Sequence, residues 1–125
     1  MSLRKFNFED LKVYQKALDF VDVVYRVSSN FPKEETYRLS SQFIRAATSI
    51  ALNIAEGSED TNQQFNRFLK IASGSIKECV VCISIAKKQS YIDEVTQETL
   101  REDLEELSKM IAGLQKYLRE KSTSN

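Results

Sequence analysis

The chain has 125 residues, 42% of them apolar and 29% charged, so it is long enough for one folded domain and too apolar for a disordered chain. Its 18 basic residues balance its 18 acidic ones, which excludes a global positive field as the basis of nucleic-acid or membrane binding. Three glycines and one proline are too few turn residues for a many-stranded sheet, so the composition favours a few long helices.

The first predicted helix spans residues 9–30, and Asn7 or Asp10 is its expected cap. Apolar residues recur along it at three- and four-residue spacing in two adjacent stripes. One stripe contains Leu11, Tyr14, Leu18, Val21 and Tyr25, and the other contains Val13, Ala17, Phe20, Val24 and Val27. A small bundle does not need this much apolar surface, so the extra width predicts contact with another copy. A wide but wholly intramolecular face is the alternative.

The second predicted helix spans residues 33–56, because Pro32 disfavours helical geometry at Phe31 and suits the first turn of a new helix. Gly57 is its expected C-terminal stop. Its apolar stripe contains Leu39, Phe43, Ala46, Ile50 and Ile54. Small residues are concentrated here and around Gly74 in the third helix, which predicts that the two backbones approach closely and that Gly74 is needed for tight packing.

The third predicted helix spans residues 61–89 and starts with a capping box formed by Thr61 and Gln64. Its main apolar stripe contains Phe65, Leu69, Ala72, Ile76, Cys79, Ile83 and Ala86, and further apolar residues lie beside it. After a turn at residues 89–93, the fourth predicted helix spans residues 94–121. Its unbroken heptad seam contains Leu100, Leu104, Leu107, Ile111, Leu114 and Leu118.

These four segments and their short connections predict an all-α fold: a single domain over residues 1–125, built as an up-down-up-down antiparallel four-helix bundle. The N-terminus lacks an apolar core of signal-peptide length, and no apolar run is long enough to span a membrane. We therefore expect a cytoplasmic protein without a membrane partner.

The residue types that most enzymes require are missing from this sequence. There is no histidine, and the three glycines are too far apart for a phosphate-binding loop or a dinucleotide fingerprint. We expect no catalytic residue, no metal site and no cofactor. Cys79 and Cys82 match a C-x-x-C spacing, but in the middle of an apolar helix they are better interpreted as buried packing. The acidic run from Glu98 to Glu106 is better interpreted as a solvated helix surface than as a metal site.

Charge is unevenly distributed along the chain. Residues 36–92 contain seven basic and four acidic residues, whereas residues 93–125 contain five basic and eight acidic ones. The third helix has a stripe opposite its apolar seam that includes Gly74 and Ser84 and contains no acid. The candidate nucleic-acid-binding residues are Arg38, Arg45, Arg67, Lys70, Lys77 and Lys88. They could contact phosphates, and ordinary solubilising charge is the slightly favoured alternative.

Four segments carry a resemblance to a known family: residues 8–17 (FEDLKVYQKA), 31–35 (FPKEE), 45–57 (RAATSIALNIAEG) and 68–75 (FLKIASGS). Together they resemble the 23S rRNA intervening-sequence proteins over nearly the whole chain. The resemblance implies a four-helix bundle from a bacterium with no established biochemical activity. The chain is also similar to the accessory variability proteins of diversity-generating retroelements, which implies a homopentamer that contacts RNA or DNA together with a reverse transcriptase.

A polar motif lies within residues 45–57 of this resemblance. Ser49, Asn53 and Glu56 fall on adjoining faces of the second helix beside apolar neighbours, and we expect them to bond to an adjoining helix, at Ser75 or Arg67. With Gly57 and Gly74 they form the predicted structural motif. The sequence thus predicts a non-enzymatic homo-oligomer, with a pentamer favoured, that associates with RNA or DNA. A protein-binding scaffold without nucleic-acid binding is the alternative.

Overall fold

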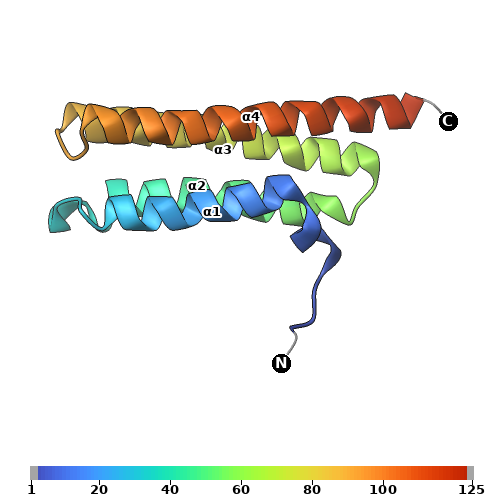
Figure 1. Ribbon diagram of the computed structural model, residues 1–125, viewed down its shortest axis with the longest axis horizontal. Helices are drawn as coiled ribbons and strands as arrows, with labels where there is room; N and C mark the ends of the chain where they lie inside the picture. The colour runs from blue at the N-terminus through green and yellow to red at the C-terminus, as the bar shows by residue number, and fades with distance from the viewer. Residues whose placement is uncertain (1–2, 124–125) are drawn as a thin grey trace.

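The computed structural model describes residues 3–123. This part of the chain forms four long helices and contains no strand (Figure 1), which confirms the predicted all-α class. The helices are α1 (Lys12–Ser28), α2 (Leu39–Ser58), α3 (Asn62–Lys88) and α4 (Glu94–Thr123), and two short 3-10 helices, η1 (Asn7–Asp10) and η2 (Lys33–Glu35), precede α1 and α2. Residues 1, 2, 124 and 125 of the predicted domain lie outside the described residues.

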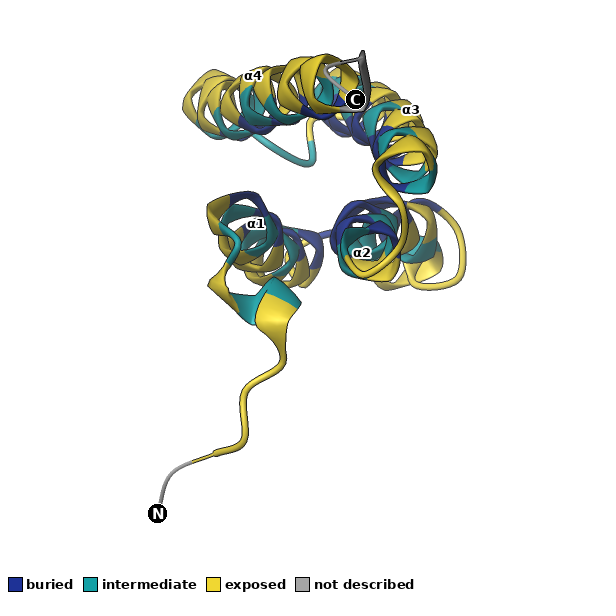
Figure 2. Ribbon diagram, turned by 90° about the vertical axis from the view of Figure 1, so that its right-hand side faces the viewer, coloured by how far each residue is buried: buried dark blue, intermediate teal, exposed yellow. Residues whose placement is uncertain are grey.

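The four helices stand at the corners of an open square when they are viewed end-on (Figure 2). Each helix packs against the helices before and after it in the chain, and α1 also contacts α4. The α2–α3 pair has the closest packing and the α1–α4 pair the sparsest. Small buried side chains allow this close packing, as the sequence predicted: Ala46 and Ala47 in α2 and Ala72 and Ser75 in α3 are all buried.

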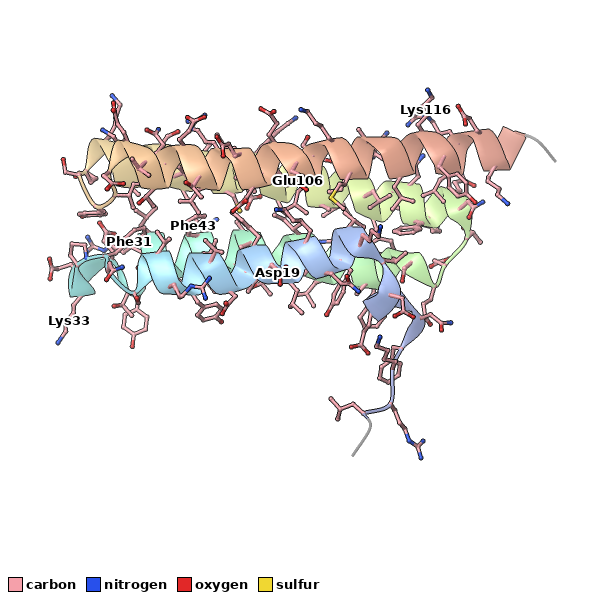
Figure 3. All side chains as sticks on the ribbon, viewed as in Figure 1. Asp19, Phe31, Lys33, Phe43, Glu106 and Lys116 are labelled. Carbon is pink, nitrogen blue, oxygen red and sulfur yellow. The ribbon has the colours of Figure 1, made fainter. Side chains whose placement is uncertain are left out.

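The core consists of one apolar stripe from each helix. In α1 only Val13, Ala17, Phe20 and Val24 of the predicted stripes are buried. In the second predicted stripe, Leu11, Tyr14 and Val21 are half-buried against the core, and Leu18 and Tyr25 are exposed. All the predicted stripe residues of α2 and α3 are buried, and in α4 only Leu114 is half-buried. Phe43 lies between the α1–α2 layer and the α3–α4 layer, and Lys116 points away from the bundle (Figure 3). Fully burying a side chain such as Phe43 stabilises the fold by roughly 1.5–3 kcal/mol.

The start of each of the first two helices differs from its prediction. Helix α1 begins at Lys12, after Leu11 as N-cap with no side-chain cap, because Asn7 and Asp10 belong to η1. Helix α2 begins at Leu39, six residues after the predicted start. The N-cap of α2 is Arg38, whose backbone (φ −121°, ψ −104°) is neither helical nor extended, and it separates the short turn of η2 from α2.

The end of α2 also differs from its prediction. Gly57 was expected to stop the helix, but α2 continues to Ser58, and no described glycine has a positive φ. Gly57 is instead buried against α3, where a Cβ atom would lie 2.7 Å from Phe68 Cβ and 2.9 Å from Phe65 Cδ1. This glycine is therefore required by helix packing and not by a turn.

The starts of α3 and α4 follow side-chain caps. Thr61 Oγ1 accepts a hydrogen bond from Gln64 N at 3.2 Å, which is one half of the predicted capping box. The other half is absent, because Thr61 N donates to Asp60 Oδ1 at 2.8 Å and not to the Gln64 side chain. Asp93 Oδ1 accepts a hydrogen bond from Thr96 N at 2.7 Å before α4. In the turn between them Ser90 has φ 63°, and Tyr91 Oη donates a hydrogen bond to Glu35 Oε2 at 2.8 Å. None of the described helices has a long enough apolar run to cross a lipid bilayer.

Candidate nucleic-acid interface

The six candidate cations are exposed and unpaired. Within residues 3–123 none of them forms a salt bridge or a side-chain hydrogen bond, whereas Lys5, Lys16, Arg26 and Lys109 all pair with acids. Arg38 is the N-cap of α2, and the others belong to α2 and α3: Arg45, Arg67, Lys70, Lys77 and Lys88. An unpaired ammonium or guanidinium group can bind a phosphate without first breaking an ion pair.

Helical geometry spreads these charges along the bundle. Arg38 and Arg45 are seven residues apart, so they lie on the same side of α2, two turns from each other. Lys70 and Lys77 have the same spacing on α3. From Arg67 to Lys88, α3 rises by about 30 Å, which is the length of roughly nine base pairs of B-form DNA. The cations therefore form an elongated set that suits a nucleic-acid backbone better than a single small anion.

One position of the predicted basic stripe faces a neighbouring helix. Ser84 is half-buried, where it accepts a hydrogen bond from Arg101 Nη2 at 2.9 Å and donates one to Val80 O at 3.0 Å. Its expected place on the outer stripe was wrong, because this part of α3 packs against α4. The acids within α2 and α3 are Glu56 and Glu78, both exposed, so the surface is net basic without being free of acids.

Helix α4 has the opposite charge. Glu98, Glu102, Glu105 and Glu106 are exposed, which confirms that the acidic run is a helix surface. Asp103 is half-buried and lies 3.5 Å from Lys16 Nζ, which is also 3.1 Å from Glu106 Oε2. The uneven distribution of charge along the sequence thus becomes a basic α2–α3 side and an acidic α4.

The predicted polar motif is only partly a contact between helices. Ser75 Oγ donates a hydrogen bond to Ser49 Oγ at 2.8 Å, which confirms the link between α2 and α3. Asn53 Nδ2 bonds within α2, to Ser49 O at 2.8 Å and Ser49 Oγ at 3.0 Å. Glu56 is exposed and makes no described hydrogen bond to α3. The predicted contact with an adjoining helix therefore holds for Ser49 but not for Asn53 or Glu56, and Glu56 is exposed to solvent.

Gly74 was predicted to allow close packing, and this prediction was also wrong. It is exposed, and a Cβ atom built there has no neighbour within 4 Å. Position 74 lies on the outer side of α3, whereas the contact with α2 passes through Ser75. Of the two glycines in the predicted motif, only Gly57 lacks room for a Cβ atom.

The two cysteines are buried, as predicted, and the pKa of each thiol is raised. Cys79 is fully buried and Cys82 is 2% exposed. Loss of hydration, followed by the charges at Cys82 and Glu78, raises the pKa of the Cys79 thiol to about 12. Burial also raises the pKa of Cys82. Neither thiol can supply an appreciable amount of thiolate near neutral pH.

Sequence reasoning missed Lys16. Its side chain lies on α1 and forms salt bridges with Asp103 and Glu106 of α4. Helices α1 and α4 are the pair with the sparsest packing. A lysine at the edge of an apolar stripe, facing a helix with acids at matching spacing, was the signal that could have found it. The hydrogen bond to Glu106 is the main cause that raises the pKa of Lys16.

Comparisons with known proteins identify the family that the sequence resembles. A sequence model described as 23S rRNA-intervening sequence protein matches residues 9–113. No curated protein matches the chain. Among solved structures, the fold is similar to that of a protein with unknown function from the S23 ribosomal protein family of Bacteroides thetaiotaomicron. The TM-score is 0.77 and the identity 24%, over 83% of this chain and 98% of that chain. At this identity the likeness supports the fold alone.

Proposed function

The chain belongs to the 23S rRNA-intervening sequence protein family, and from this premise we propose that it is a non-enzymatic homo-oligomer that binds RNA or DNA through the phosphate backbone. The observation that supports binding is the set of six exposed cations on α2, its N-cap and α3 that have no acid partner within residues 3–123. Residues that contact phosphates give affinity without reading the base sequence, so we expect little preference among sequences.

The affinity should depend steeply on salt. If six phosphates are neutralised, the logarithm of the binding constant falls with the logarithm of salt concentration with a slope of about −5 on B-form DNA and about −4 on single strands. Fluorescence anisotropy with labelled RNA and DNA at two salt concentrations measures this slope.

Charge reversal tests which surface binds. We expect the double variant Lys70→Glu, Lys77→Glu to bind at least ten times more weakly than the wild type, because attraction to phosphates becomes repulsion. The matched control is Lys12→Glu, a change on α1, where Lys12 is also exposed. If the control weakens binding as much per charge as the α3 variant, net charge and not the α2–α3 surface determines affinity. If neither nucleic acid binds at low salt, this part of the proposal is wrong.

Self-association is the second part of the proposal. Its support is the apolar surface that the fold leaves uncovered, since Leu18, Tyr25 and Leu52 are all about half exposed or more. The fivefold number implied by the resemblance to accessory variability proteins stays a prediction, and light scattering tests it. The same surface favours the alternative function, a protein-binding scaffold, for which binding would be insensitive both to salt and to the Lys70 and Lys77 changes.

A further inference from the structure

A depression lies at the end of the bundle where α2 ends and α3 begins. The 3-10 helix η1 forms its other wall, and Figure 1 shows η1 and the α2–α3 connection at the same end of the molecule. The volume of the depression is about 370 Å³, which is in the range of small-ligand sites. We call this depression the η1 pocket, and its lining residues are Asn7, Phe8, Leu11, Ser58, Glu59 and Phe65.

The wall that η1 contributes is held in place by its own contacts. The Phe8 ring meets the Tyr14 ring of α1 edge-on, with ring centroids 5.0 Å apart. Glu9 Oε1 accepts a hydrogen bond from Phe6 N at 2.9 Å, and Glu9 O accepts one from Gln15 Nε2 at 2.8 Å. Because η1 is fixed to α1 in this way, a ligand does not have to order the η1 pocket when it binds.

Apolar side chains form part of the η1 pocket. Phe8 and Leu11 are half-buried, and Phe65 is 7% exposed. A ligand that covers the exposed parts of Phe8 and Leu11 removes apolar surface from water, which favours binding. The η1 pocket therefore suits a ligand with a short hydrocarbon chain.

The polar part of the η1 pocket is acidic. Residues 7–11 and 58–65, which supply the lining, contain four acidic residues and no basic one. Asp10 is paired with Lys5 at 3.1 Å, whereas Glu59 lines the η1 pocket and makes no ion pair among residues 3–123. Glu59 is also the C-cap of α2, where the carbonyl groups of the last helical turn carry a partial negative charge. The carboxylate and the helix C-terminus both attract a cation.

The polar groups of the η1 pocket match a guanidinium group in particular. The Glu59 carboxylate only accepts hydrogen bonds, and the amide oxygen of Asn7 has no donor among residues 3–123. A guanidinium group presents five N–H donors in one plane, so it can bond to two acceptors at once. It is also more weakly hydrated than an ammonium group, so it loses less when it leaves water to lie against apolar side chains.

We propose that the η1 pocket binds an alkylguanidinium group, with its charge at Glu59 and its hydrocarbon chain on Phe8 and Leu11. This is the chemistry of an arginine side chain and of small guanidine compounds. The η1 pocket is separate from the basic α2–α3 surface, because Arg67 lies two residues after Phe65 and leaves α3 about 200° around the helix axis from it. Nucleic-acid binding, self-association and this site can therefore each fail without the others.

Two-dimensional NMR with N-butylguanidinium as the probe tests the site. The backbone amide signals of residues 7–11 and 58–65 should shift and saturate, with a dissociation constant on the order of 1 mM for so small a ligand. N-butylurea has a similar shape and no charge, and it should bind at least ten times more weakly. The absence of a saturable shift at these residues, or equal binding of the two compounds, overturns the proposal.

The variant Glu59→Gln tests the charge. It should weaken binding of N-butylguanidinium at least fivefold and leave the circular dichroism spectrum unchanged, because Glu59 is exposed. The matched control is Glu34→Gln, since Glu34 is exposed on η2 at the opposite end of the bundle (Figure 1), and it should bind like the wild type. Unchanged affinity in Glu59→Gln, or equal losses in both variants, overturns the assignment of the charge to this site.

Two variants test the place of the hydrocarbon chain. Phe8→Ala and Leu11→Ala should each weaken N-butylguanidinium binding about threefold or more, because apolar contact with the chain is lost. Binding of methylguanidinium, which lacks the chain, should change less than twofold. Equal losses for the two probes in both variants would show that the chain does not lie on Phe8 and Leu11.

Two further ligands identify the source of the guanidinium group. Arginine capped at both ends presents the group as a protein side chain does, and agmatine presents it on a free small molecule. If capped arginine binds as tightly as N-butylguanidinium, the η1 pocket accepts an arginine side chain of a peptide or protein. If agmatine alone binds as tightly, the η1 pocket accepts a small molecule and excludes a peptide backbone. If neither binds, the proposal is overturned for both natural sources.

Discussion

Two glycines in long helices show how differently the same residue is used. A methyl group at Gly57 would overlap Phe68 and Phe65 of α3, whereas a methyl group at Gly74 meets open space. We expect Gly57→Ala to lower the free energy of unfolding by about 1–3 kcal/mol through overpacking. Gly74→Ala should raise it by about 0.5–1 kcal/mol, because alanine restricts the unfolded chain and favours a helix. Urea denaturation of the two variants checks both signs, and a stabilised Gly57→Ala would contradict the packing.

The buried thiols give a second prediction at the scale of single residues. At neutral pH we expect neither Cys79 nor Cys82 to react with a thiol reagent in the folded protein, because both are buried and burial raises the pKa of each. Both should react fully in denaturant. The control Ser108→Cys, at an exposed position of α4, should be labelled at once. Rapid labelling of the wild type would show that the C-x-x-C pair is accessible.

The sequence predicted some side-chain contacts and missed others for a physical reason. The bond between Ser49 and Ser75 could be expected because two polar residues on facing apolar helices need partners. The orientations of Gly74 and Ser84 could not, because a rotation of α3 by a fraction of a turn decides which of its residues face α2, α4 or solvent. Periodicity identifies stripes, and the neighbouring helices decide which stripe is covered.

At the scale of whole helices, predictions were most accurate where a side-chain cap marks a boundary. Thr61 and the turn after Lys88 gave the limits of α3 almost to the residue. Helices α1 and α2 start without a side-chain cap, so the sequence had no marker for Lys12 or Leu39. Both starts follow a 3-10 helix, whose tighter turn has the same apolar spacing over a few residues.

The α1–α4 contact is the weakest in the bundle, so an ion pair is more important there than elsewhere. Lys16 is 27% exposed and Asp103 28%, and the hydrogen bond to Glu106 above all raises the pKa of Lys16 above its ordinary value of 10.5. A raised lysine pKa means that this contribution is complete below pH 10.5 and is lost as the pH rises through the folded-state pKa. The contribution is of the order of 1 kcal/mol or less, because the pair is partly solvated.

We therefore expect Lys16→Met to be less stable than the wild type at neutral pH and to approach it as the pH rises above 10.5. Denaturation at a series of pH values measures the difference. The control is Lys109→Met, because Lys109 and Glu105 form an exposed pair within α4 and should contribute almost nothing. A difference between Lys16→Met and the wild type that is independent of pH would indicate lost packing of the lysine stem and not a lost charge.

The whole molecule separates its charges while its net charge is zero. The fold places the basic residues of α2 and α3 on one side and the exposed acids on α4, so the acids should oppose the binding of a polyanion near α3. Composition alone could not predict this, because a balanced count is compatible with any arrangement of charges. The heptad stripes predicted the four helices. The order of the helices around the bundle then places the basic part of the sequence on the α2–α3 side and the acidic part on α4.

A change on α4 can therefore test nucleic-acid binding without touching the proposed binding residues. We expect Glu98→Gln with Glu102→Gln to raise the affinity for RNA or DNA by roughly two- to fivefold at low salt, because removing two negative charges weakens repulsion of the phosphates. The gain should vanish near 1 M salt, where the Debye length is about 3 Å. The control, Asp19→Asn with Glu34→Gln, removes two exposed charges from α1 and η2. Equal gains in both double variants would mean that net charge governs binding, and no gain in either would count against a phosphate-binding surface on α3.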